Sequence, residues 1–92
     1  MPVGLFMPTI STFSGMTLRI YYNDHPPPHF HVYHQPDEAK VGIEDFRILD
    51  GYLPRRMLRL VRSWAKIHQE ELRDNWFFAE THQVLKMIAP LE

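Results

Sequence analysis

The feature that most constrains the fold is a triple proline set between two short segments of alternating hydrophobicity. Apolar and polar side chains alternate over residues 18–22 and again over residues 29–33, which is typical of strands with one buried face. Prolines 26–28 cannot donate ladder hydrogen bonds, so neither strand runs through them. The sequence therefore predicts two antiparallel strands joined by an extended, polyproline-like connector.

Two further strands are predicted after the turn "HQPD", in "EAKVGI" and "FRIL", before the chain turns again at Asp50-Gly51. Requiring all apolar side chains to share one face fixes the register, because a one-residue slip would expose the whole set. The predicted pairs are Tyr22–Phe30, Ile20–Val32, Val32–Ala39, Phe30–Val41, Val41–Ile48 and Ile43–Phe46. The result is an antiparallel meander of four strands.

Residues 54–80 carry the period of a helix. Pro54 suits a first helical turn, and the residues that follow at spacings of three and four are Met57, Leu60, Val61, Trp64, His68, Leu72 and Ala79. We expect one long helix with a kink or break near Asp74, followed by a short extended arm. The predicted fold class is α+β: a four-stranded antiparallel meander with one long C-terminal helix packed on one face.

Length and composition narrow the class of protein. A chain of 92 residues with 45% apolar content has one core and one domain. Because cysteine is absent, any metal has to be held by His, Asp or Glu. The opening residues lack the pattern of a signal peptide, and no segment approaches the roughly 20 apolar residues of a membrane span. We expect a cytoplasmic protein without a membrane partner.

Positive charge is concentrated on the predicted helix. The net charge is −1, yet residues 55–73 hold six basic and only two acidic residues. Five of the basic residues lie opposite the apolar stripe of the helix and form what we call the basic stripe: Arg55, Arg59, Arg62, Lys66 and Arg73. Three interpretations remain open, namely a solvated helix face, a nucleic-acid surface and a docking site for an acidic protein.

Four of the six histidines fall within residues 23–34, and the register places His29 and His31 on the open face of the sheet. One interpretation is a plain exposed strand. Another is a metal-independent acid/base pair that cleaves phosphodiesters, since histidine exchanges protons near neutral pH. The side chains that would act beside this pair, holding or activating a phosphate, are Tyr21, Tyr33, Arg19 and Lys40.

A metal site is the third interpretation. His29 and His31 are about 6.6 Å apart at Cα, so their imidazoles can converge on one ion. A third ligand is hard to place, because an extended connector holds His25 about 12 Å from His29 unless the prolines turn. Lys40 lies across from His31, where it would repel a cation. We therefore expect no cofactor, and any metal would take its ligands from His29, His31, Asp24 and His25.

The chain resembles the small bacterial proteins of the DUF4160 family in "MPTIS", "YYNDHPPPHFHVY", "DGYLPRR", "RSWAKIHQEELRDNW" and "LKMIAPL". The resemblance implies a single domain over residues 7–92, with residues 1–6 as an N-terminal extension. It also implies a genetic neighbour of the DUF2442 type, in pairs that look like toxin–antitoxin modules. On that basis we expect a component of such a module that binds RNA or its protein partner.

Overall fold

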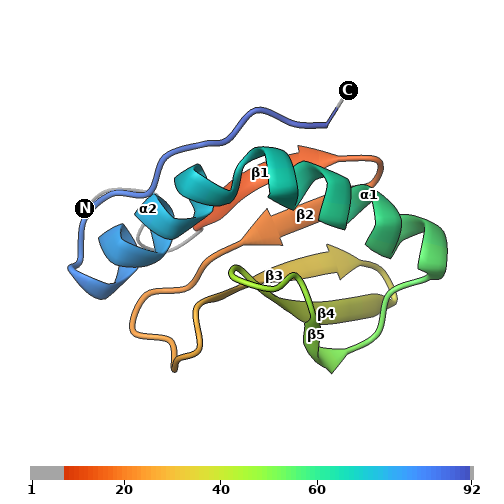
Figure 1. Ribbon diagram of the computed structural model, residues 1–92, viewed down its shortest axis with the longest axis horizontal. Helices are drawn as coiled ribbons and strands as arrows, with labels where there is room; N and C mark the ends of the chain where they lie inside the picture. The colour runs from red at the N-terminus through yellow and green to blue at the C-terminus, as the bar shows by residue number, and fades with distance from the viewer. Residues whose placement is uncertain (1–7, 92) are drawn as a thin grey trace.

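In the part of the chain that the structure describes, five antiparallel strands form one meander in which each strand pairs with the next (Figure 1). The structure is a computed structural model that describes residues 8–91, so the proposed N-terminal extension lies outside the described residues. The elements are β1 (Thr9–Phe13), β2 (Met16–Arg19), β3 (His29–His34), β4 (Asp37–Gly42), β5 (Ile48–Gly51), α1 (Arg55–Ile67) and α2 (Gln69–Glu80). The α+β class and the antiparallel meander are confirmed.

The prediction of four strands is wrong, because β1 precedes the first predicted strand. It pairs with β2 through a two-residue turn at Ser14 and Gly15, whose φ angles of 52° and 76° are both positive. Such a turn matches the twist of a hairpin. The sequence pattern did not predict β1, because its register shifts between Thr9 and Ser11. Such a shift breaks the strict alternation of apolar and polar side chains that identifies a strand.

The register is confirmed for β3 against β4, where Phe30 pairs with Val41, and for β4 against β5, where Val41 pairs with Ile48. Between β2 and β3 it differs by two residues, since Val32 pairs with Leu18 and not with Ile20. A shift of two residues leaves each side chain on its predicted face. The side chains of β2 and β3 therefore lie on the predicted faces of the sheet, although their cross-strand partners differ from the predicted ones.

The single long helix is also a wrong prediction. The chain bends at His68, between α1 and α2, and not near Asp74. After the bend, the Gln69 side-chain amide donates to the carbonyl oxygen of Ile43 at 2.9 Å, and Arg73 binds the Glu44 carboxylate. These contacts attach α2 to the turn between β4 and β5, so that α2 departs from the direction of α1.

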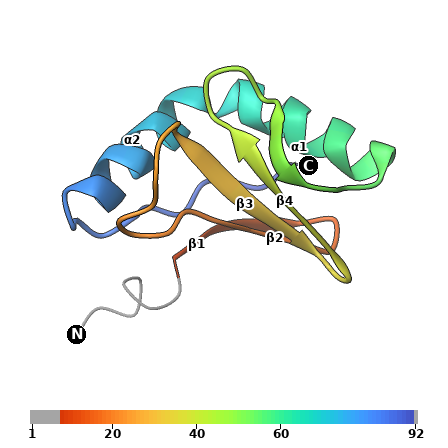
Figure 2. The same cartoon turned by 90° about the horizontal axis from the view of Figure 1, so that it is seen from below.

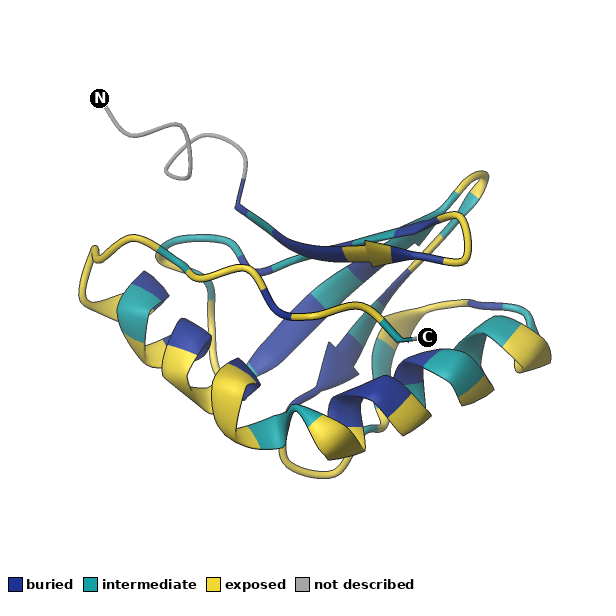
Figure 3. Ribbon diagram, turned by 90° about the horizontal axis from the view of Figure 1, so that it is seen from above, coloured by how far each residue is buried: buried dark blue, intermediate teal, exposed yellow. Residues whose placement is uncertain are grey.

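Both helices cover the same face of the sheet, and the core lies between the two layers (Figures 2 and 3). Phe30 and Val41 from the sheet and Trp64 from α1 are completely buried. The ring of Trp64 packs against Phe13 and Phe30, with centroids 5.5 Å and 5.8 Å apart. Within residues 8–91, no helix lies over the opposite face of the sheet (Figure 3).

The predicted C-terminal arm is confirmed as an extended segment. Asn75 of α2 is 1% exposed, and its side chain both donates to the Lys86 carbonyl and accepts from the Lys86 N–H, each at 2.8 Å. Further along, the Ile88 N–H donates to the Ile10 carbonyl at 2.7 Å and so covers the edge of β1. The arm is thus held by a helix on one side and by the sheet on the other.

Within residues 8–91, neither helix has the length and apolar character needed to cross a membrane.

We predict that Asn75→Ala will lower the free energy of unfolding by about 2 kcal/mol, because it removes two buried hydrogen bonds worth about 1 kcal/mol each. Denaturant unfolding followed by tryptophan fluorescence measures the loss. Gln83→Ala, in the same arm but exposed, is the control and should cost no more than about 0.5 kcal/mol. Equal losses in the two variants would show that Asn75 does not anchor the arm.

Candidate functional site

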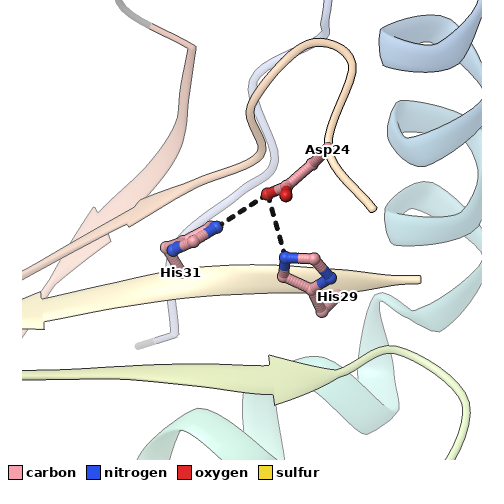
Figure 4. Close-up of side chains that lie close together, drawn as sticks. All are labelled: Asp24, His29 and His31. Carbon is pink, nitrogen blue, oxygen red and sulfur yellow. Dashed lines mark hydrogen bonds and ion pairs between the residues drawn. The ribbon is translucent and has the colours of Figure 1, made fainter. Parts of the chain in front are cut away.

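The loop between β2 and β3 folds back over the beginning of β3 and brings Asp24 to face His29 and His31 (Figure 4). The predicted extended connector is therefore wrong. In this loop the Pro26–Pro27 peptide bond is cis, and Asn23 has a positive φ of 59°. Asp24 thus lies beside two histidines from which it is separated by five and seven positions in the chain.

The three side chains form a tight cluster, which we call the Asp24–His29–His31 cluster. Asp24 Oδ2 lies 2.9 Å from His29 Nε2 and 3.0 Å from His31 Nε2. One nitrogen or oxygen from each residue lies within 4.8 Å of the others, a geometry in which the three could hold one metal ion. Asp24 Oδ1 accepts from the backbone N–H of His25 at 2.9 Å, while His25 itself is exposed. Of the four candidate metal ligands, three meet and His25 does not join them.

His29 is only 4% exposed, so the expectation of two exposed histidines is wrong for this residue. Its ring packs against Trp76 of α2, with centroids 5.3 Å apart, and contacts the folded loop through Asp24 and Pro27. His31 is more accessible, with a side chain 14% exposed. The sequence pattern missed the burial of His29 because α2 and the loop lie outside the strand on which the prediction was based.

The hydrogen bonds of His29 determine which of its nitrogens carries a proton. Nδ1 lies 2.8 Å from the carbonyl oxygen of Pro27, and a carbonyl only accepts, so Nδ1 is the donor. In a neutral imidazole, Nε2 then has a lone pair and no proton. This lone pair faces the Asp24 carboxylate, which is also an acceptor. A proton or a cation has to lie between them for the contact to be favourable.

The pKa directions fit ionised Asp24 and neutral His31. Burial raises the pKa of Asp24, but hydrogen bonds from the His31 side chain and the His25 N–H, with the charge of His29, bring that pKa below its ordinary value. Burial is the largest cause lowering the pKa of His31, and the charges of His29 and Lys40 add to it, although Asp24 opposes it. Asp24 is therefore in the form that binds metals, and neutral His31 has to release the Nε2 proton that it donates to Asp24 before this nitrogen can bind an ion.

Tyr21 and Tyr33 continue the polar face beyond His31. Their hydroxyl oxygens are 2.6 Å apart, and His31 packs edge-on against Tyr21 with centroids 4.7 Å apart. Burial and the neighbouring Tyr21 raise the pKa of Tyr33 far above its ordinary value, so its hydroxyl stays protonated. Arg19 lies over the Tyr33 ring, 5.3 Å from its centroid. The residues predicted for this face therefore adjoin one another, and Tyr33 is a hydrogen-bond donor rather than a base.

Lys40 pairs directly with His31 in the sheet, as predicted. It lines two adjoining hollows of about 240 Å³ and about 190 Å³, the first shared with His31 and Tyr33 and the second with Asp24 and His29. Among the described residues, Lys40 forms no ion pair. A free ammonium group thus adjoins the Asp24–His29–His31 cluster on the uncovered side of the sheet.

The basic stripe is only partly free. Arg55, Arg59 and Lys66 are exposed, form no ion pair within residues 8–91 and line a shallow groove of about 300 Å³. Arg62 also lines this groove, but its Nε donates to the Phe46 carbonyl at 2.9 Å. Arg73 is occupied by Glu44 and Glu70. The stripe belongs to the helical layer, so it does not adjoin the histidine face.

Comparison with known proteins gives a family and no characterised relative. No curated protein and no solved structure matches the chain. The model of the DUF4160 family, a domain of unknown function, matches residues 15–77, which include β2 to β5, the folded loop, α1 and most of α2. The chain belongs to the DUF4160 family.

Proposed function

We propose that this domain binds one divalent transition-metal ion through Asp24, His29 and His31. The observation that carries the proposal is the convergence of Asp24 Oδ2 on the Nε2 atoms of His29 and His31, at 2.9 Å and 3.0 Å. An ion bound there takes the place of the proton that His29 Nε2 and the Asp24 carboxylate would otherwise share. The Pro27 carbonyl, which accepts from His29 Nδ1, acts as the outer partner that orients a metal-binding imidazole.

The distances support the same conclusion. Ligand atoms about 2.0–2.1 Å from one ion, at angles between tetrahedral and octahedral values, lie about 2.9–3.4 Å from each other. Asp24 Oδ2 is 2.9 Å from one histidine nitrogen and 3.0 Å from the other. The third separation, between the ligand nitrogens of the two histidines, is within 4.8 Å, so binding of one ion by all three groups would bring the two imidazoles into the same range.

The donor set narrows the identity of the metal. Two imidazoles and one carboxylate suit zinc, iron, cobalt, nickel or copper better than magnesium or calcium, which prefer oxygen ligands. Three protein ligands leave at least one coordination position for water or substrate, as in catalytic rather than structural zinc sites. The free position would open toward the hollows beside Lys40.

A metal-independent ribonuclease that uses His29 and His31 is less well supported. A general acid or base needs a nitrogen that can reach the substrate. Both nitrogens of His29 are engaged, one by Pro27 and the other by Asp24, and the residue is almost completely buried. His29 is therefore better placed to hold an ion than to exchange protons with RNA.

We predict that zinc will bind with a stoichiometry of one per chain in isothermal titration calorimetry. His31→Ala should weaken this binding by about 100-fold or more, because loss of even an outer partner of a metal ligand typically costs 10–100-fold. His25→Ala is the matched control. It changes an adjacent histidine outside the cluster and leaves the backbone N–H that donates to Asp24 in place.

Circular dichroism of the three proteins checks that each is folded. The proposal fails if the parent protein gives no one-to-one binding, or if His31→Ala binds zinc as tightly as the parent does.

We propose, as a second function, that the free part of the basic stripe binds RNA within a toxin–antitoxin-like module. Arg55, Arg59 and Lys66 support it, because three unpaired cations border one groove while the acidic residues of the helices are placed elsewhere. The alternative for the same surface is a DUF2442-type protein partner. Both occupants would approach the helical layer and leave the metal cluster free.

If RNA binds there, replacing Arg55, Arg59 and Lys66 together by Gln should lower the slope of log K against log salt by about two units. Each phosphate contact to a single strand contributes about 0.7. Fluorescence anisotropy of a labelled RNA at several salt concentrations measures the slope. Arg56→Gln, on α1 but outside the groove, should leave it unchanged.

If the triple variant has the same salt slope as the parent protein, the basic stripe does not contact RNA. If the parent protein does not bind RNA, and the triple variant associates more slowly with a DUF2442-type protein, the stripe serves the protein partner instead.

A further inference from the structure

We infer that the metal ion in the Asp24–His29–His31 cluster takes a phosphate group as its additional ligand, with Lys40 as the countercharge. This inference rests on the proposed metal site and identifies the chemistry of what that site accepts. Its starting observation is the position of Lys40, which borders both hollows beside the cluster and has no ion-pair partner among the described residues.

The charges around the cluster favour an anion. A divalent ion next to the Lys40 ammonium is a repulsive arrangement that water only partly screens. Asp24 offsets part of this charge from within the cluster. Glu38 and Asp50 also line the hollows, but both are exposed, so solvent weakens their effect. An anionic ligand that contacts both the ion and Lys40 converts the repulsion into attraction.

The size of the hollows favours a small group. Their volumes of about 240 Å³ and about 190 Å³ are below the roughly 300–1,000 Å³ of sites that enclose drug-sized ligands. They are still several times the roughly 30 Å³ that one water occupies. A phosphate fits, either as a free ion or as one group of a larger molecule that remains outside.

The arrangement of donors favours a tetrahedral anion over a carboxylate. Of the two hydroxyl groups of Tyr21 and Tyr33, only one proton is used in their mutual hydrogen bond, so one O–H remains as a donor. When Tyr21 donates in that bond, the free O–H is that of Tyr33, which lines the first hollow together with His31 and Lys40. The metal, Lys40 and the Tyr33 hydroxyl then provide three separate attachment points around this hollow. A phosphate has enough oxygens to meet all three, and lysine is a common phosphate ligand.

Cobalt is a suitable probe, because its visible absorption responds when its coordination changes. We will first load the full chain with one equivalent of Co²⁺ and then titrate with inorganic phosphate. The expected result is a saturable change in the cobalt bands. Lys40→Gln should bind Co²⁺ at least as tightly as the parent but raise the Kd for phosphate about tenfold, as expected for loss of one charge-assisted contact.

Two variants serve as controls. Lys40→Arg keeps the charge and should retain most of the phosphate affinity. Lys86→Gln removes an exposed lysine from the C-terminal arm, outside both hollows, and should leave the affinities for Co²⁺ and phosphate unchanged. If Co²⁺ fails to bind with one equivalent, the metal site itself is refuted and this inference with it. If Co²⁺ binds but phosphate leaves the bands unchanged, or if Lys40→Gln binds phosphate as well as the parent does, the metal site stands and the phosphate assignment is refuted.

Discussion

The packing of Trp64 between the two layers is the interaction on which the rest of the structure depends. Its ring contacts Phe13 of β1 and Phe30 of β3, and its Nε1 donates to the Ala89 carbonyl at 2.8 Å. One side chain therefore joins the first strand, a central strand, α1 and the C-terminal arm. Burial of a side chain of this size contributes several kcal/mol and holds α1 on this side of the sheet.

Because the helices occupy one face, the polar residues of β3 and β4 are left together on the other. His31, Tyr33 and Lys40 lie there at positions set by the strand register. Alternation along the strands separates them from Phe30 and Val32, which are in the core. One-sided packing of the helices thus leaves the polar side chains of the candidate site together on the uncovered face. The folded loop between β2 and β3 contributes the remaining residue of the cluster, Asp24.

The second region of interest has a different physical origin. Arg55, Arg59 and Lys66 are exposed because they lie opposite the apolar stripe by which α1 contacts the core. Cations on an outer helix face remain hydrated and mobile, which suits an extended anionic partner more than a small ligand. The Asp24–His29–His31 cluster and the basic stripe therefore lie in different layers of the domain, and the interactions proposed for them can be tested separately.

The sequence by itself determined which side chains share a face. Alternation of period two placed Phe30 and Val32 on the face opposite to His31, because any odd slip would have exposed the apolar set. The short turn after His34 left little freedom in the pairing of β3 with β4, whereas the longer loop before β3 left an even slip of two residues open. Helical periodicity identified the exposed side of α1 in the same way. These are local properties, decided by the spacing of residues along one element.

Only the tertiary structure decided which other elements of the chain contact these faces. β1 was hidden by an irregular register, and the helix bends at His68 because Gln69 and Arg73 bind the distant turn at residues 43 and 44. The burial of His29 depends on Trp76, which belongs to another element. The meeting of Asp24 with two histidines depends on a loop whose path the letters "DHPPPH" leave open. Contacts between elements far apart in the chain follow from the packing of the whole domain, and no local pattern encodes them.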